Sequence, residues 1–209
     1  MQAQPGRDGV KPLASGTNRY ALGDLFAYDH VDHLRDVTTR IVHRVTHADD
    51  DRVEINGGVV VFDQMGSILR NGAGTKNPGL LHAPTSIAIG KRWRTAFTNT
   101  TSRGVVQTNY WDFRVEALED IEVPAGAFRA FKVVGNGESQ APSGQTLLAQ
   151  TYWIDPATML WVLQHSKYHH MGGPRVRMTE DSSTRLVSLK LAPRRDETAP
   201  TPTAAGHPA

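Results

Sequence analysis

The sequence predicts an all-β protein: a single antiparallel, strongly curved sheet of about nine or ten strands, as an open sheet, half-barrel or sandwich. Three observations support this prediction. Runs of β-branched and aromatic residues, which favour pleated strands, recur along the chain. Turn-forming residues separate these runs at spacings of roughly 8–12 residues. The 209 residues include 19 glycines and 12 prolines, which is turn-rich but below the range typical of disorder.

We expect one folded domain over residues 19–191. Hydrophobic residues make up 39% of the chain, and all-β domains of roughly 200 residues are commonly single domains. Residues 1–18 are polar and rich in Gly and Pro, which predicts a flexible N-terminal arm. Residues 192–209 are rich in Pro, Thr and Ala, which predicts a disordered tail.

The first clear strand signal covers residues 37–46, where seven of ten residues are β-branched and therefore stiff at χ1. Because side chains alternate along a strand, Ile41, His43 and Val45 share one face, and we expect that face to point toward the core. Further strands are predicted over 52–55 and 59–63, after turns at 49–51 and 56–58.

Residues 70–90 interrupt the strand pattern. Glycines and prolines such as Gly72, Gly74 and Pro78 leave little room for regular structure. A loop of this length inside a compact domain is usually functional or mobile. We therefore expect a long loop at 70–90 that acts as a lid.

The strand pattern returns after residue 91. Over 105–118, Trp111, Phe113 and Val115 alternate with polar residues and share one face. Residues 121–134 predict a hairpin, because Pro124 cannot donate to a ladder and Gly126 can adopt the positive φ of a tight turn. A loop is predicted at 136–145, followed by strands over 146–154, 160–168 and 175–191.

Three segments resemble bacterial envelope proteins of the TapB-like class, a largely uncharacterised group. They are the G-x-x-W pattern at 89–93, the V-P-A-G-x-F hairpin at 122–132 and the T-x-W strand end at 151–157. The resemblance spans about residues 89–190, with Ala127 in place of the usual threonine, and extends more faintly from residue 22. It implies an open, curved sheet similar to lipoprotein-carrier half-barrels and a periplasmic or secreted location, and it brings no catalytic residues.

Composition excludes several classes of protein. The chain has no cysteine, so thiol catalysis, disulfides and cysteine-bound zinc are excluded. Its net charge is +2 with basic and acidic residues mixed, which argues against a nucleic-acid partner. No apolar run approaches the ~18 residues of a membrane span. Residues 1–20 lack the apolar core of a signal peptide, so the chain is either cytosolic or has lost its signal.

Motifs for catalysis are absent from the sequence. The segment nearest to a nucleophile elbow, at 137–141, ends in alanine and falls in a predicted loop. The glycine-rich segment at 72–76 lacks the Lys-Ser/Thr pair of a phosphate loop. We therefore expect a protein that is not an enzyme and has no cofactor.

Four histidines lie close together in the sequence and are the weak candidates for a metal site: His30, His33, His43 and His47. Imidazole binds zinc, copper and nickel. On a strand, however, residues four apart are separated by about 13 Å. A site would need the two segments as adjacent strands, with Asp29 or Asp32 as a further ligand; scattered histidines are the simpler interpretation.

Aromatic residues on the predicted strands are the candidate ligand-binding residues: Trp93, Trp111, Phe113, Phe128, Phe131, Trp153 and Trp161. The simpler interpretation is that they fill the core. The sharper one is that they line a groove on a concave face.

The sequence thus predicts a non-catalytic envelope protein that binds an apolar small molecule, a lipid or a partner segment. One alternative is an accessory or structural subunit of a larger envelope assembly, whose 70–90 loop and termini wrap a protein partner. The other is a histidine metal-binding protein.

Overall fold

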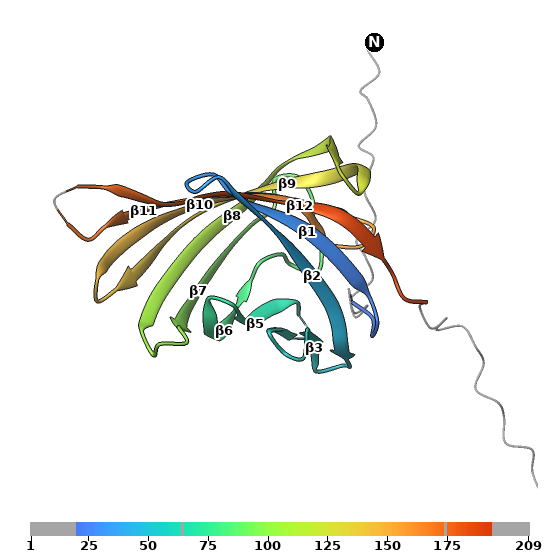
Figure 1. Cartoon of the computed structure of the whole chain (residues 1–209), viewed down its shortest axis with the longest axis horizontal. Helices are drawn as coiled ribbons and strands as arrows, with labels where there is room; N and C mark the ends of the chain where they lie inside the picture. Colours follow the sequence, from blue (N-terminus) through green and yellow to red (C-terminus); the bar gives the residue numbers. More distant parts are fainter. Residues whose placement is uncertain (1–19, 64, 174, 194–209) are drawn as a thin grey trace, which may run out of the picture.

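The computed structural model describes residues 20–63, 65–173 and 175–193, and within them twelve strands form one closed antiparallel barrel (Figure 1). Each strand pairs with its neighbours in the sequence, and β1 pairs with β12 to close the ring. The all-β antiparallel prediction is confirmed. The prediction of an open sheet, half-barrel or sandwich with nine or ten strands is wrong, because the two edge strands that it left free bond to each other.

The strands are β1 (Leu25–Asp32), β2 (Val37–Ala48), β3 (Arg52–Ile55), β4 (Val60–Asp63), β5 (Ser67–Asn71), β6 (Gly74–Leu81), β7 (Arg92–Thr100), β8 (Val106–Val123), β9 (Gly126–Ala141), β10 (Gly144–Ile154), β11 (Trp161–Met171) and β12 (Arg177–Lys190). No helix in the described part of the chain is long and apolar enough to span a membrane.

The two ends of the barrel differ. Because neighbouring strands are antiparallel, the turns that follow odd-numbered strands lie at one end, which we call the open end. The opposite end, the closed end, holds the turns that follow even-numbered strands. There, the tip of the long β8–β9 hairpin reaches β12, and the backbone N–H of Ala125 donates to the Leu186 carbonyl at 3.2 Å. The hairpin also buries Val123 and Ala130 in the core, so it stops that end of the barrel.

The turn of this hairpin is the one that the sequence predicts. β8 ends at Val123 and β9 begins at Gly126, whose φ is 128°. An L side chain rarely adopts this conformation, so glycine serves the turn through its backbone freedom. The alternation of Trp111, Phe113 and Val115 on the inner face is confirmed as well.

The prediction of a long loop at 70–90 is wrong for residues 70–81. β5 and β6 form a strand pair with a turn at residues 72–73, and β6 also pairs with β7 through Thr75, Lys76 and Asn77. Only residues 82–91 are irregular, and they lie at the closed end with Ala83 and Ile87 buried in the core. The segment therefore packs as a stopper rather than as a lid.

The predicted loop at 136–145 is also wrong. β9 continues to Ala141 and β10 begins at Gly144, so only residues 142–143 form the turn. Polar and glycine residues there suggested a loop, but both strands have pairing partners on either side. The predicted arm at 1–18 lies outside the described residues, as does nearly all of the tail at 192–209.

Two halves of the barrel begin in the same way. Gly23 before β1 and Gly90 before β7 have φ values of 90° and 86°. The N–H of Gly23 donates to the Val45 carbonyl on β2, and the N–H of Gly90 donates to the Val115 carbonyl on β8. A register shift follows each of these valines. The two halves of the barrel, β1 to β6 and β7 to β12, thus share the same entry turn and the same shift in register.

Candidate functional site

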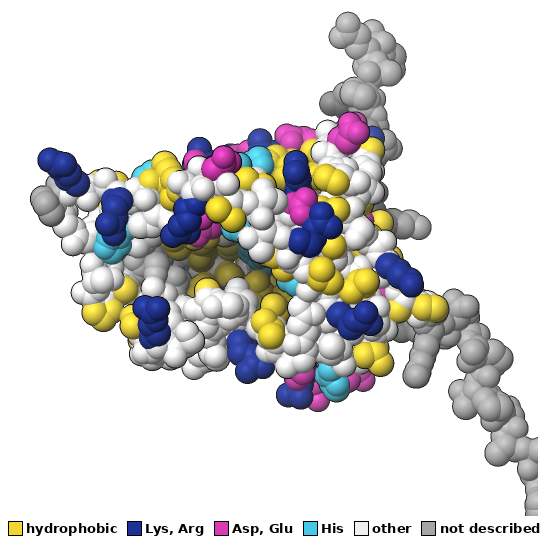
Figure 2. All heavy atoms as spheres, in the orientation of Figure 1, with side chains coloured by type: hydrophobic (Ala, Val, Ile, Leu, Met, Phe, Trp, Pro, Cys, Tyr) yellow, Lys and Arg dark blue, Asp and Glu magenta, His cyan; other side chains and the backbone are white. Residues whose placement is uncertain are grey.

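The barrel encloses a cavity of about 510 Å³ that reaches the open end. Figure 2 shows the hollow in the face presented in Figure 1, with hydrophobic side chains in its depth and Lys and Arg side chains around it. Ligand pockets in proteins typically have volumes of about 300–1,000 Å³. The cavity therefore has the size of a small-molecule site.

The depth of the cavity is apolar and aromatic. Its lining here consists of Phe26, Tyr28, Ile55, Phe62, Ile68, Leu80, Phe97, Trp111, Leu148, Leu160 and Trp161. These side chains come from β1, β3 to β8, β10 and β11, and from Leu160 directly before β11, because every second residue of a barrel strand points inward. Such a lining favours an apolar ligand.

Glycines on β9 make room for the rings on β8. Trp111 and Phe113 stack with ring centroids 5.3 Å apart, and their register partners on β9 are Gly137 and Gly135. A Cβ atom at Gly137 would clash with the Tyr110 carbonyl oxygen and lie 2.7 Å from Cδ2 of Trp111, so a larger residue would displace the β8 backbone and the indole. Sequence reasoning missed this role of the two glycines; their alternation along one strand was the available signal.

A second aromatic group forms the opposite wall. Tyr28 stacks on Trp161 at 4.2 Å and contacts the His43 ring at 5.6 Å. The Tyr28 hydroxyl donates to the Trp161 carbonyl at 3.3 Å. Burial raises the pKa of Tyr28 and lowers that of His43. Both changes favour neutral side chains on this wall.

Polar side chains form a band nearer the open end. Asn99 donates to Gln107 Oε1 at 3.0 Å and to the Ala73 carbonyl at 3.0 Å. Gln150 donates to the Tyr168 hydroxyl at 2.6 Å, and burial raises the pKa of Tyr168 to about 12. The band therefore offers neutral amide and hydroxyl groups for positioning a ligand.

Lys76 is the one Lys, Arg, Asp or Glu among the described residues that line the cavity. Its side chain comes from β6, and the residue is 7% exposed. The ammonium donates to Asn71 Oδ1 at 2.6 Å, to the Gly74 carbonyl at 3.3 Å and to Asn99 Oδ1 at 3.4 Å. Burial lowers the pKa of Lys76 to about 8. A cation thus lies in the cavity with neutral acceptors around it.

The seven aromatic candidates fall into different places. Trp111 and Trp161 line the cavity. Phe113 and Phe131 are fully buried core residues, and Trp93 packs on that core while donating to the Leu81 carbonyl at 3.1 Å.

Phe128 and Trp153 pack against the second core cluster, around the closed end. Trp153 donates to Glu119 Oε2 at 2.9 Å and contacts the ring of His165. Ligand binding by all seven stays a prediction, and of the seven only Trp111 and Trp161 are among the described residues that line the cavity.

The four candidate histidines do not converge. His30 bonds to Thr184, His33 to Ser183 and His47 to Asp49, while His43 lies in the cavity wall. β1 and β2 are adjacent, as the metal hypothesis requires. Even so, the described residues contain no group of three His, Cys, Asp or Glu side chains arranged to hold an ion.

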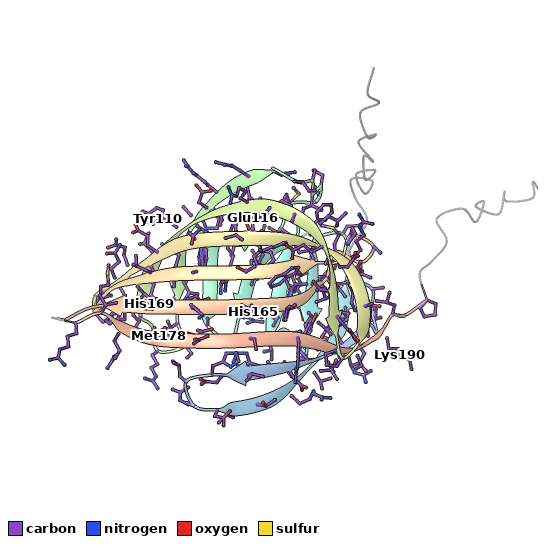
Figure 3. The ribbon with its side chains drawn as sticks, turned by 90° about the horizontal axis from the view of Figure 1, so that it is seen from above. Tyr110, Glu116, His165, His169, Met178 and Lys190 are labelled. Carbon is purple, nitrogen blue, oxygen red and sulfur yellow. The ribbon has the colours of Figure 1, made fainter. Side chains whose placement is uncertain are left out.

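Other histidines lie on the outer surface. Figure 3 views the wall of β9 to β12 from outside and labels His165 and His169 on β11 next to Met178 on β12. Their register partners include the exposed Leu147. These side chains therefore belong to the outer face and not to the cavity.

Sequence reasoning also missed Lys76 and the amides of the polar band. Lys76 falls in the segment predicted as a loop, so its direction could not be assigned. Gln107 and Asn109, however, precede Trp111 by four and two residues on the same strand. Their alternation with Trp111 places them on its face, and this signal was present in the sequence.

No known protein family matches the chain, and no curated protein matches it. Among solved structures, a candidate lipoprotein from Parabacteroides distasonis ATCC 8503 is 15% identical with a TM-score of 0.41, over 82% of this chain and 98% of that one. A candidate exported protein with a YmcC-like fold from Bacteroides fragilis NCTC 9343 is 13% identical with a TM-score of 0.42, over 82% and 97%.

The hypothetical lipoprotein YmcC from Escherichia coli K12 is 14% identical with a TM-score of 0.45, over 82% of this chain and 85% of that one. At such low identities and TM-scores, these similarities assign no function to the chain. Membership of the TapB-like class stays a prediction.

Proposed function

We propose that this protein binds an apolar molecule inside its barrel, as a non-catalytic binding protein of the bacterial envelope. The observation that carries the proposal is the cavity of about 510 Å³ whose depth is lined by aromatic and aliphatic side chains. An apolar ligand gains roughly 25 cal/mol for each Å² of apolar surface that it removes from water. The resemblance of the 122–132 hairpin to envelope proteins supports the location.

A pair of neighbouring substitutions tests the proposal. Ser139 faces the cavity and is 8% exposed, whereas the preceding Glu138 pairs with the exposed residues Tyr110 and Leu147 on the outer face. Ser139→Trp should fill the cavity and weaken binding of a neutral apolar probe, hexadecan-1-ol, by about tenfold or more. Glu138→Trp adds the same ring outside and should leave the affinity unchanged.

Binding can be followed by tryptophan fluorescence. Variants that retain only Trp111 or only Trp161 should respond to the probe, while a variant that retains only Trp153 should not. A folded protein that binds no hexadecan-1-ol, or one that binds it equally well after Ser139→Trp, would contradict an interior site. The accessory-subunit alternative stays a prediction. It had the 70–90 loop wrap a protein partner, but residues 70–81 of that segment belong to the barrel wall.

A further inference from the structure

We infer that the ligand ends in an acidic group, a carboxylate or a phosphate, and that Lys76 binds this group at the open end of the cavity. The inference rests on the proposed function and adds the chemistry of the ligand's polar end. The apolar chain of the ligand would lie against Trp111 and the apolar lining in the depth of the cavity, and its acidic head would lie beside the β5–β6 turn.

The first support is the charge on Lys76. Moving an ammonium out of water is costly unless an opposite charge compensates it. Lys76 is 7% exposed, and no carboxylate is found among the described residues that line the cavity. Its three acceptors are the neutral oxygens of Asn71, Gly74 and Asn99. An anionic ligand would supply the negative charge that Lys76 lacks among these neighbours.

The second support is the geometry around the ammonium. Its bond to Asn71 is short, at 2.6 Å, while its contact with Asn99 Oδ1 is 3.4 Å. The longer contact is the one that an incoming oxygen can replace at little cost. The same amine bonds to Asn71 and Gly74, which flank the β5–β6 turn, so the side chain is held in place before the ligand arrives. Preorganisation of this kind favours affinity.

The third support is the distribution of charge between the two ends. Turns at the open end carry Arg35, Arg103 and Arg175, and Asp36 is the one carboxylate in them. Arg35 pairs with Asp32, whereas the turns of Arg103 and Arg175 contain no carboxylate. Turns at the closed end carry four carboxylates, Asp49, Asp50, Asp51 and Asp155, and one basic residue, Lys91. Basic groups around a cavity mouth raise the local concentration of anions.

Three probes with the same alkyl chain and different heads test the inference: hexadecan-1-ol, palmitate and hexadecyl phosphate. The wild type should bind one or both acids about tenfold or more tightly than the alcohol, because hydrogen bonds to charged groups are the stronger ones. Whichever acid binds more tightly identifies the head group. Equal affinity for all three probes would overturn the inference while leaving the interior site intact.

Substitutions locate the effect. Lys76→Met should abolish the preference for the acids, so that this variant binds palmitate and hexadecyl phosphate no more tightly than it binds hexadecan-1-ol. Lys167→Met, which removes a lysine paired with Asp181 on the outer face, should change neither. If Lys76→Met keeps the preference for acids, the head group binds elsewhere and the inference fails. If the wild type binds none of the three probes, the proposed function itself fails.

Discussion

The two halves of the barrel start alike and end differently. β3, β4 and β5 of the first half have four, four and five residues, whereas β9, β10 and β11 at the corresponding places of the second half have 16, 11 and 11. At about 3.3 Å per residue, a four-residue strand spans about 13 Å and a 16-residue strand about 50 Å. Only the second half is long enough to fold over the end of the barrel.

The two halves also contribute differently to the hydrophobic core. Nine of the twelve buried residues in the first core cluster belong to β7, β8, β9 and β10, and the other three lie in the connections at 82–91 and 155–160. Buried residues of the first half, such as Phe26 and Val45, pack in a second cluster completed by Val123, Ala130 and Leu186 of the second half. The long half thus supplies most of the first cluster and the hairpin that covers the closed end, while the short half carries Asn71 and Lys76 at the open end.

The largest expected difference between the halves is in their cores. Phe113 is fully buried, and Phe113→Ala should lower the free energy of unfolding by about 3–5 kcal/mol. Phe62 in the first half is half-buried against Tyr20, and Phe62→Ala should cost less than about 3 kcal/mol. Urea denaturation measures both. An equal or larger loss at Phe62 would show that this half-buried ring stabilises the barrel as much as the fully buried Phe113.

The next largest difference in stability is expected between Asp24 and Lys91, the residues that follow Gly23 and Gly90 in the turns before β1 and β7. Asp24 is fully buried and accepts the N–H groups of Ala21 and Ala192, both at 2.8 Å. Asp24→Ala should cost about 1.5–3 kcal/mol, because both donors lose a charged acceptor. The equivalent Lys91 bonds to Ser86 at 2.6 and 2.8 Å, and Lys91→Ala should cost less.

A thermal or urea melt of the two variants would decide this point. Asp24 ties Ala192, two residues after the end of β12, to the start of β1, so its loss should weaken the pairing that closes the barrel. If Asp24→Ala melts like the wild type, the carboxylate does not hold the seam. Asp24→Asn keeps one acceptor oxygen, so its stability should lie between those of the wild type and Asp24→Ala.

Equal effects are expected where the two halves repeat each other. Gly23→Ala and Gly90→Ala should each cost about 1–3 kcal/mol, since both glycines have positive φ. A Cβ atom meets nothing within 4 Å at Gly90 and only Ala192 Cβ at 3.8 Å at Gly23, so the cost comes from the backbone alone. Gly173→Ala, at an open site without positive φ, is the control. Clearly unequal losses at Gly23 and Gly90 would contradict the structural repeat.

The smallest expected effect concerns Lys76 and pH. Burial lowers its pKa to about 8 from 10.5, so between these pH values the unfolded chain binds more protons and stability rises with pH. Below about pH 8 the folded wild type carries the full cost of the charge. Lys76→Met should therefore be more stable than the wild type at pH 7, and its advantage should shrink as pH rises from 8 toward 10.5.

Urea melts at pH 7 and pH 10 measure this difference. Asn71 and Asn99, which face Lys76 from β5 and β7, and Gln107 beyond them do not titrate. The other titratable groups of the cavity are present in both proteins: Tyr20, Tyr28, His43, His82 and Tyr168. A variant that is less stable than the wild type at pH 7 would show that the bonds of Lys76 to the turn outweigh the burial of its charge.

The sequence by itself determined the features that depend on near neighbours. Alternation along 105–118 put Trp111, Phe113 and Val115 on one face, and the turn at Pro124 to Gly126 followed from the backbone limits of proline and glycine. Both depend on local geometry, because the side-chain period of a strand is two and a turn is decided by a few residues.

Only the tertiary structure decided which strands meet and what faces the interior. β6 is a strand because β5 and β7 accept and donate its hydrogen bonds, although its Gly and Pro residues favour a loop. The pairing of β1 with β12 joins residues about as far apart as the domain allows. Whether an inward side chain meets a packed core, as Phe131 does, or a cavity, as Trp111 and Lys76 do, depends on the residues across the barrel. Those residues come from distant strands, and no local pattern records them.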